Sequence, residues 1–521
     1  MYRKIDLKLS PTEAADPAAI ARAAAEATGW QADDVRVVLL RKSIDARSRY
    51  PFVLLQIGVY YQEEPPVTAP MLARLKDVSH ATPVIIVGAG PAGYFAALEL
   101  IAQGLKPIIF ERGKDVQTRR RDLRAIQQDG TVHPHSNYCY GEGGAGTYSD
   151  GKLYTRSIKR GDWLKTLQLL VEHGANPDIL VEAHPHIGSN KLPKIVTALR
   201  ETIEKQGGEV HFDSFVTDFI CPKDEICGIV VNGTTEHLAK AVLLATGHSA
   251  RDIYALCLRK NITIEAKPFA LGVRIEHPQS LIDTLQYKQT PREENLPAAP
   301  YKLVCQVAQN QTTRGVFSFC MCPGGLVVPA ATAPGELVVN GMSMSRRDSP
   351  FANSGIVTAV ELDDMAAFAK QGVLAGQAFQ QSVEQRLWQA GDGSQRAPAQ
   401  RLTDFVQGKL SSTLNDTSYI PGVWSAPLHE LLPRFIAERL REGLRQFGKQ
   451  MPGYYTEEAN VIGCESRTSA PVRIPRNPTT LMHVHTKGLF PCGEGAGYAG
   501  GILSAAMDGQ NVAQAIAAYL A

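Results

Sequence analysis

The sequence of 521 residues has almost no excess of charge of either sign. It contains 54 lysine and arginine residues against 52 aspartate and glutamate residues, a formal net charge of +2. A basic surface for nucleic acid or for an acidic membrane is therefore not expected. Long hydrophobic runs are also missing, so neither a transmembrane span nor an N-terminal signal segment is predicted.

Cysteine motifs are equally scarce. The nine cysteines are an odd number, they are scattered along the chain, and no CxxC pair occurs among them. In the absence of a signal segment, this usage predicts reduced thiols and a cytoplasmic protein. Internal repeats and low-complexity tracts are lacking too. A chain of this length and ordinary composition is expected to be a globular enzyme of two or three domains.

The stretch that begins at residue 84 has the pattern of a nucleotide-binding turn. Residues 84–87 are an apolar run of the length of a buried parallel strand. Gly88, Gly90 and Gly93 follow at GxGxxG spacing, and residues 94–103 are predicted to be helical. The glycines permit a tight turn, close approach of a pyrophosphate and close helix–strand packing, while the helix N-terminus attracts negative charge.

A second strand supports this prediction. Residues 106–110 are apolar and end at Glu111, 23 residues after Gly88, where an acid can accept hydrogen bonds from ribose hydroxyls. Glycine spacing alone would also fit a structural turn. Because strand, turn, helix and acid all occur together, a dinucleotide-binding site of Rossmann type is predicted.

Three later segments are rich in glycine at positions that suit cofactor contact. Residues 140–153 contain a dense glycine run, for which a surface loop is the alternative interpretation. An apolar strand at 241–245 leads directly into Thr246 and Gly247. A strand and a Gly-Glu turn at 488–495 precede a helix predicted from 502 to 519, whose N-terminus would point its dipole at the cofactor.

The remaining chain completes an α/β fold. Residues 1–80 are predicted to be a small α+β domain of β-α-β-β order with a linker, its helix capped by Asp16 and begun by Pro17. A Rossmann-like domain covers 81–261 and 456–521, and a mixed α+β substrate domain, 262–455, interrupts it. In that insertion, strands forming a largely antiparallel sheet are expected first, followed by helices at 357–370, 377–390 and 427–447.

The motifs together resemble a known family. The GxGxxG turn with Glu111, the Ala245-Thr246-Gly247 strand end and the C-terminal Gly-Leu-Phe-Pro-Cys-Gly-Glu resemble the FAD fingerprints of glutathione-reductase-type flavoproteins with a single nucleotide-binding domain. Longer runs, including Gly-Glu-Gly-Gly-Ala-Gly-Thr-Tyr-Ser-Asp-Gly-Lys-Leu and Phe-Ser-Phe-Cys-Met-Cys-Pro-Gly-Gly, are similar to the bacterial FAD-dependent dehydrogenase family. The resemblance covers nearly the whole chain.

This resemblance implies a set of residues that hold non-covalent FAD. The pyrophosphate would lie on Gly88, Gly90, Pro91, Ala92 and Gly93. Glu111 would bind the adenosine ribose, with Arg112 and the Val216 backbone at the adenine end. The remaining contacts implied are Gly144, Ala145, Gly146 and Thr147 near the isoalloxazine or pyrophosphate, Thr246 and Gly247 at a strand end, Gly493 and Glu494 at the ribityl-pyrophosphate, and Gly501 and Ile502 at the flavin pyrimidine.

Candidates for chemistry lie outside these motifs. Cys320 and Cys322 alternate along a predicted strand, so both thiols could share a face. They fit a redox dithiol beside flavin, a metal half-site, a substrate-site lining, or small residues under a tight turn. Arg467 and Arg473 could clamp a substrate carboxylate or form internal ion pairs. His248 follows a strand-end glycine and could be an acid or base, or a loop cap.

Metal binding is not expected. Three HxH pairs occur, at 133/135, 184/186 and 483/485, but no carboxylate accompanies them at ligand spacing. The expected function is that of an FAD-dependent oxidoreductase, a dehydrogenase that moves a hydride between a small organic substrate and flavin N5. The alternatives are a flavin monooxygenase and a non-catalytic FAD-binding sensor. No second GxGxxG unit appears, so NAD(P)H is expected only as a transient reductant.

Overall fold

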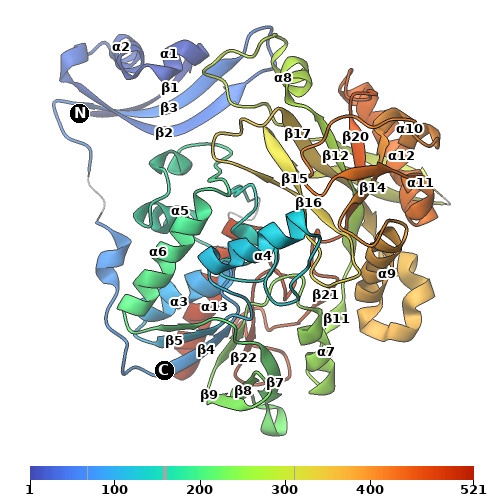
Figure 1. Ribbon diagram of the computed structural model, residues 1–521. Coiled ribbons are helices and arrows are strands. Elements are labelled where there is room, and N and C mark those ends of the chain that lie inside the picture. Colours follow the sequence, from blue (N-terminus) through green and yellow to red (C-terminus); the bar gives the residue numbers. More distant parts are fainter. Residues whose placement is uncertain (67–68, 156–160, 310) are drawn as a thin grey trace.

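The computed structural model describes residues 1–66, 69–155, 161–309 and 311–521. The ribbon has three regions (Figure 1): a small N-terminal unit, a parallel sheet flanked by helices, and a large, mainly antiparallel sheet with its own helices. Among the described residues, no helix combines the length and the apolar character that a membrane crossing requires.

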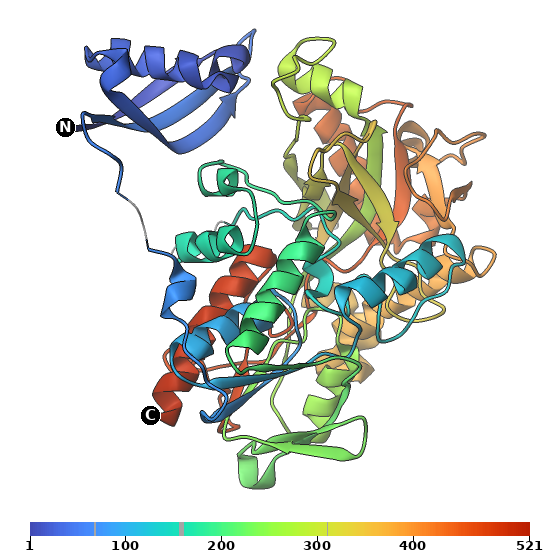
Figure 2. The ribbon, with the colours of Figure 1, turned by 60° about the vertical axis from the view of Figure 1, so that its left-hand side comes forward.

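The N-terminal unit is a three-stranded antiparallel sheet with helices on one face (Figure 2). Its strands are β1 (Tyr2–Leu9), β2 (Val35–Asp45) and β3 (Phe52–Tyr61), in the order β1-β3-β2. Alternate β3 side chains, among them Leu55 and Ile57, are buried under the helices. A backbone hydrogen bond of 2.8 Å from Lys42 to Val181 joins β2 to the main body.

This unit has one helix more than the sequence pattern predicts. Helix α2 (Pro17–Thr28) begins as expected, with Asp16 as its N-cap and Pro17 in its first turn. The short helix α1 (Pro11–Ala15) precedes it. Ser10 and Glu13 form a reciprocal capping box, which stabilises this extra turn of helix. The order is therefore β-α-α-β-β.

The five-stranded sheet combines segments that are far apart in the chain. Its order is β22-β10-β4-β5-β6, and all pairs are parallel. The strands are β4 (Pro83–Val87), β5 (Lys106–Phe110), β6 (Glu209–His211), β10 (Val242–Leu244) and β22 (Leu489–Pro491). The C-terminal strand β22 therefore forms one edge of the sheet whose central strand is β4.

Both faces of this sheet are covered, as the apolar strands require. Val84 and Ile86 pack against helices α3 (Pro91–Ala102) and α13 (Ile502–Leu520), which lie side by side in Figure 1. Ile85 faces the other way. It contacts the core under a small antiparallel sheet of β7 (Val216–Ile220), β8 (Gly228–Val231) and β9 (Thr235–Leu238).

The large sheet has seven strands in the order β13-β14-β17-β12-β20-β18-β19. It is antiparallel except for the β18–β19 pair, as the sequence pattern predicts for most of it. Its strands are β12 (Phe269–Pro278), β13 (Val304–Gln309), β14 (Thr312–Cys322), β17 (Phe351–Val360), β18 (Ala397–Arg401), β19 (Val423–Ser425) and β20 (Asn460–Glu465). Strand β20 thus belongs to this sheet although it lies beyond the expected boundary at residue 455.

One helix prediction in this region is wrong. Residues 357–360 form the end of β17, a central strand between β14 and β12. The β-branched run Ile356-Val357-Thr358 suits a strand buried on both faces, and this environment overrides the helical periodicity. Helical structure begins only at the 3₁₀ segment Leu362–Leu374, which leads into α9 (Ala375–Gln389).

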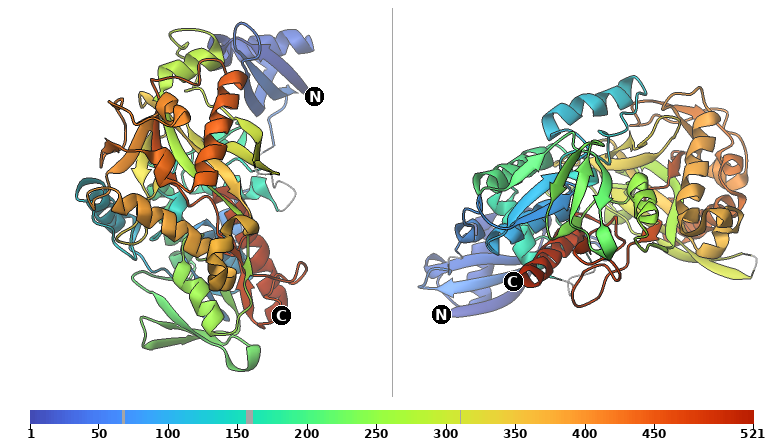
Figure 3. Two further views of the ribbon diagram at one scale, coloured as in Figure 1. Left: turned by 90° about the vertical axis from the view of Figure 1, so that its right-hand side faces the viewer. Right: turned by 90° about the horizontal axis from the view of Figure 1, so that it is seen from below.

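The other elements connect and cover the two main sheets. Helix α12 (Arg434–Gln450) contributes the apolar side chains Leu440 and Leu444 to the core of the large sheet. In the right-hand view of Figure 3, the N-terminal unit and the orange helices of the large-sheet region lie at opposite ends of the molecule. The remaining elements are α4 (Val116–Gln128), α5 (Trp163–Glu172), α6 (Leu192–Lys205), α7 (Arg251–Arg259), α8 (Gln279–Tyr287), α10 (Leu402–Gln407), α11 (Leu428–Leu431), β11 (Glu265–Ala266), β15 (Gly325–Pro329), β16 (Val339–Ser343) and β21 (Val472–Arg473).

Close packing of α13 on α3 gives the first testable prediction. A Cβ atom at Gly509 would lie 2.1 Å from the Ala92 carbonyl oxygen. We expect Gly509→Ala to lower the free energy of unfolding by about 1–3 kcal/mol, because the helices must separate. Urea denaturation measures this. The control is Gly315→Ala, where the nearest atom would be 3.8 Å away; equal stability of the two variants would contradict the packing argument.

Candidate functional site

A cavity of about 350 Å³ lies where the parallel sheet meets the large sheet. The ends of β4 and β10, the loop around residues 139–154, the start of α13 and the end of β14 all line it. The predicted cofactor residues that line it are Gly88, Gly90, Pro91, Ala92, Glu111, Arg112, Gly144, Ala145, Gly146, Val216, Thr246, Gly247, Glu494, Gly501 and Ile502. Segments separated by hundreds of residues thus converge on one space.

The turn between β4 and α3 forms one wall of this cavity. Gly88 has a φ of +107°, and a Cβ there would lie 2.4 Å from the Ala245 carbonyl oxygen. A Cβ at Gly93 would lie 2.0 Å from the Gly88 carbonyl oxygen, so Gly93 packs the helix on the strand and does not line the cavity. At Gly90, in contrast, a Cβ would meet no atom within 4 Å. Gly90 therefore leaves open space above the start of α3.

Glu111 holds the backbone around this turn. One carboxylate oxygen accepts a hydrogen bond from the Ala89 N–H at 2.9 Å. The other accepts from the Gly113 and Gly141 N–H groups, both at 2.9 Å. The residue predicted to bind a ribose thus also ties the glycine turn to the loop at residue 141. Its side chain is 5% exposed at the cavity wall.

Arg112 and Val216 lie near each other at one end of the cavity. The Arg112 guanidinium lies over the rings of Tyr140 and Phe215, with its carbon 4.5 and 4.6 Å from the two ring centroids. It also forms an ion pair with Asp252. These contacts hold the planar guanidinium beside the start of β7. A planar cation in this position suits an aromatic ligand.

The glycine-rich loop is held in place by a buried arginine. Arg119 of α4 donates hydrogen bonds to the carbonyl oxygens of Asn137, Glu142 and Gly144, at 2.8, 2.8 and 2.9 Å. A Cβ at Gly144 would lie 3.4 Å from the Gly90 Cα. Thr147 does not line the cavity, because its hydroxyl is buried and donates to the Glu142 carbonyl oxygen at 2.9 Å.

The C-terminal segment supplies the opposite wall. The Gly493 N–H donates to the Asp508 carboxylate at 2.8 Å, so Gly493 lies behind the cavity rather than on its surface. Arg476 holds the same carboxylate through two bonds, at 2.6 and 3.0 Å. Glu494 does line the cavity, and burial raises its pKa to about 7, with Lys267 opposing the shift. Gly501 and Ile502 begin α13 beside it.

The residues predicted to carry chemistry are only partly brought together. Cys320 and His248 line the cavity, whereas Cys322 lies fully buried behind it. Burial and the nearby Arg467 cation lower the pKa of His248 to about 4, so its imidazole is neutral at pH 7. Arg473 does not line the cavity: its side chain is exposed, with the guanidinium 5.6 Å from the Tyr498 ring centroid. This position gives no support to Arg473 as a substrate clamp.

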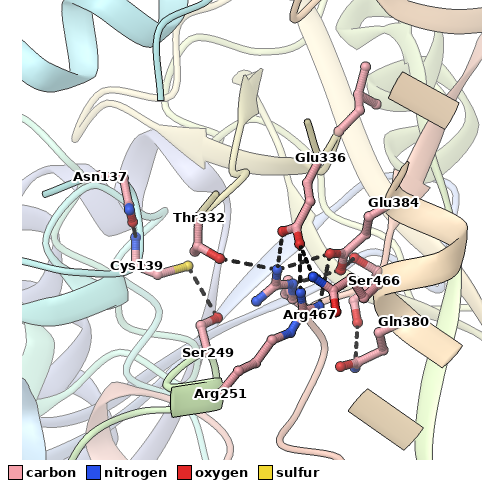
Figure 4. A network of polar contacts seen from close by, with 12 residues as sticks. Asn137, Cys139, Ser249, Arg251, Thr332, Glu336, Gln380, Glu384, Ser466 and Arg467 are labelled. Carbon is pink, nitrogen blue, oxygen red and sulfur yellow. Dashed lines mark hydrogen bonds and ion pairs between the residues drawn. The ribbon is translucent and has the colours of Figure 1, made fainter. Parts of the chain in front are cut away.

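Arg467 lines the cavity, but its guanidinium already has carboxylate partners (Figure 4). It bonds Glu384 at 2.7 Å and Glu336 at 3.1 Å. Arg251 of α7 bonds the same two carboxylates, each at 2.9 Å. Although burial opposes it, the two arginines lower the pKa of Glu384 to about 2. The structure therefore has the internal ion pairs that were the alternative to a substrate clamp.

The three HxH pairs have structural partners. His133 and His483 each accept, at Nδ1, the backbone N–H of the residue two positions on, at 3.3 Å. The His186 Nε2 lies 3.1 Å from the Ser345 carbonyl oxygen. Among the residues that the structure describes, no group of three or more histidine, cysteine, aspartate or glutamate side chains is placed to hold a metal ion.

Comparisons with known proteins identify the cofactor and the family. Residues 268–468 match a family described as "FAD-dependent protein, C-terminal domain-like", residues 81–131 match an FAD-binding domain, and residues 1–60 match a domain of unknown function. An uncharacterized protein of Clostridium beijerinckii is 41% identical over 506 residues, which cover 93% of this chain and 92% of that protein. The chain belongs to the same family of bacterial FAD-dependent proteins. FAD is its cofactor.

Two solved structures share a distant similarity with the chain. CtdE in complex with FAD and its substrate 4 is 12% identical, with a TM-score of 0.34, over 83% of this chain and 80% of that chain. A triple mutant of the flavin-dependent brominase Bmp2 is 11% identical, with a TM-score of 0.34, over 84% of this chain and 80% of that chain. Likenesses at this level say nothing about the reaction of this protein.

The cavity fits the phosphates and the flat rings of FAD. Gly90 caps α3 without a side-chain hydrogen bond, and the space that a Cβ would fill there is open. Unpaired N–H groups and the positive end of a helix dipole suit a pyrophosphate. The cation stacked on two rings at Arg112 and the carboxylate of Glu111 lie on the same side. FAD would supply the two-electron chemistry when bound.

Several residues that shape the site were missed by sequence reasoning. Arg119 lies in a charged helix, Asp508 lies within the last helix, and Lys152 follows Asp150 at the end of the glycine run. The residues next to a charged side chain in the sequence do not indicate whether that side chain is packed inside the protein. The contacts of these three residues with partners far away in the sequence become visible only in the structure.

The Glu111 contacts predict a change in cofactor affinity. In Glu111→Gln, one acceptor oxygen becomes an NH₂ group that must face backbone N–H donors. We expect FAD to bind about tenfold to a hundredfold more weakly. Quenching of FAD fluorescence during titration of the cofactor-free protein measures the Kd. The control is Glu209→Gln, whose carboxylate pairs with Lys106 outside the cavity; equal affinities of both variants would contradict the role of Glu111.

The ion-pair network predicts a change in stability. Glu384→Gln leaves two buried arginines beside one carboxylate, so we expect the free energy of unfolding to fall by about 3–5 kcal/mol. The matched control is Glu442→Gln, since that glutamate makes an exposed pair with Arg445 and should change stability by less than about 1 kcal/mol. Urea denaturation compares the two; a small effect at Glu384 would show that the network does not support the fold.

Proposed function

We propose that the protein is an FAD-dependent oxidoreductase that moves a hydride between a small organic substrate and N5 of the flavin. The observation that carries this proposal is the shared cavity. Predicted nucleotide-binding elements line one part of it, while Cys320 of the large sheet and Asn340 and Gly341 of the two-stranded sheet β15–β16 line another. A substrate held by the large sheet would therefore meet the cofactor held by the parallel sheet. The FAD-dependent family supports a redox rather than a purely structural role.

The expectation of a carboxylate-bearing substrate now has less support. Arg473 lies outside the cavity lining, and Arg467 is neutralised by two glutamates. The remaining lysine at the cavity wall is Lys152, which pairs with Asp150 at 3.1 Å. NAD(P)H stays a proposed transient reductant. A cytoplasmic location is also part of the proposal, and the absence of disulfides among all nine cysteines supports it.

Anaerobic reduction of the FAD-loaded protein tests this function. We expect the flavin absorbance band to bleach rapidly when NADH, NADPH or a member of a panel of small alcohols, amines and hydroxy acids is added without oxygen. The same protein reduced by light serves as the control for a competent flavin.

Two outcomes would contradict the proposal. A reaction that consumes the reductant only with oxygen present, and that places ¹⁸O from labelled oxygen in the product, would make the protein a monooxygenase. Photoreduction without reduction by any compound in the panel, alongside a stable complex with another protein, would favour a non-catalytic sensor.

A further inference from the structure

The end of β14 places two thiols at the boundary between the large sheet and the FAD cavity. The pairing of β14 with β17 shifts register between Phe319 and Cys322, and Cys320 has a φ of +46°. Because of this bulge, Cys320 lines the cavity while Cys322 lies buried directly behind it. The Cys322 thiol donates a hydrogen bond to the Cys320 backbone carbonyl oxygen at 3.2 Å.

Two cations contact this thiol pair. The Lys152 Nζ lies 3.8 Å from the Cys322 Sγ. One terminal nitrogen of Arg274 lies 3.4 Å from the same sulfur and donates at 2.7 Å to the Cys320 carbonyl oxygen. Arg274 is completely buried. Positive charge in such a low-dielectric setting favours the thiolate form of a cysteine.

Ion pairs surround the two thiols. Three cations, Lys152, Arg274 and Arg347, face two carboxylates, Asp150 and Glu465. Asp150 binds Lys152 at 3.1 Å and Arg347 at 2.6 Å, and Glu465 binds Arg274 at 2.7 Å. Among these ion-paired groups the cations outnumber the carboxylates, and this positive charge favours an anionic thiolate beside them.

The titration of the two thiols agrees with one thiolate in this cluster. Interaction with Cys322, together with the Lys152 and Arg274 cations, lowers the pKa of Cys320 against the effect of burial, while the pKa of Cys322 is raised. Burial raises the pKa of Glu465 to about 7, which weakens its negative charge further. Burial also lowers the pKa of His186 to about 4, so this histidine adds no charge at pH 7.

We propose that Cys320 and Cys322 form a redox-active dithiol that exchanges two electrons with bound FAD. The proposal rests on the proposed oxidoreductase function and adds a second redox centre to it. In the oxidation, the Cys320 thiolate and the Cys322 thiol form one S–S bond and release two electrons and one proton. The electrons and the proton pass to bound FAD, so that charge and atoms balance. The holoprotein then stores four electrons, whereas FAD alone stores two.

Cys320 is placed for this exchange because it lines the cavity together with the predicted FAD-binding residues. Its charge acts on Glu494 of the C-terminal FAD segment, where it contributes to the raised pKa of that carboxyl group, after burial. Asn340 and Gly341 of β16 line the cavity beside it. Cys320 is thus the thiol that faces the cavity, and its partner is the buried Cys322, whose sulfur both cations contact.

Reductive titration of the holoprotein tests the proposal. The FAD-loaded protein is oxidised with diamide, freed of the reagent, and titrated anaerobically with dithionite. We expect four electrons per FAD for the wild type and two for the double variant Cys320→Ser/Cys322→Ser. The matched control is Cys221→Ser/Cys227→Ser, a second neighbouring pair outside the cavity lining, which should still take four.

A thiol count on the wild type keeps the proposal testable should the double variant fold poorly. After acid quenching and unfolding, N-ethylmaleimide should label all nine cysteines of the reduced protein and two fewer after diamide treatment. Mass spectrometry should find the loss in the peptide that contains both Cys320 and Cys322. In Lys152→Met, formation of this disulfide should shift to higher pH, because the thiolate loses a cation.

The possible failures are distinguishable. Uptake of two electrons by the diamide-treated wild type, or loss of the extra electrons in the Cys221/Cys227 control variant, would overturn the dithiol. Normal photoreduction of FAD in the same samples would leave the oxidoreductase proposal intact. A flavin that accepts no electrons from any reductant would instead overturn the proposed function.

Discussion

The close approach of α3 to the parallel sheet is the constraint on which the site depends. Gly88 and Gly93 bring the start of α3 against β4 and the end of β10, at distances that no side chain would permit. Gly509 lets α13 pack on the same helix. The starts of both α3 and α13 therefore line one cavity. Helix termini provide N–H groups and positive potential for an anionic cofactor, so backbone packing creates the binding site.

Buried charge joins the two sheets around that cavity. Arg251 comes from the helix after β10, while Glu336, Glu384 and Arg467 come from segments of the large sheet region. Two arginines and two glutamates neutralise one another at the boundary. Around the cysteine pair, in contrast, three cations, Arg274, Lys152 and Arg347, share two carboxylates in direct ion pairs. The boundary between the two sheets thus holds one charge cluster that stabilises the fold and a second one that surrounds the thiols proposed to react.

Local motifs could be predicted from the sequence because they need only neighbouring residues. The strand, turn, helix and acid from residue 84 to Glu111 are of this kind, as is the Asp16 cap of α2. The partners of Arg467 lie 83 and 131 positions away, so sequence spacing could not choose between a substrate clamp and internal ion pairs. The error at residues 357–360 has a similar origin, since burial between two strands decided their conformation. Contacts between residues far apart in the sequence therefore decided the features that local sequence patterns could not predict.

The central claim is that one cavity holds FAD between the two sheets. A crystal structure of the protein with bound FAD tests it most directly. We expect the pyrophosphate to lie above Gly90 at the start of α3, the adenosine beside Glu111 and Arg112, and the flavin ring between Glu494 and Cys320. A flavin ring turned away from Cys320, or FAD bound outside this cavity, would contradict it.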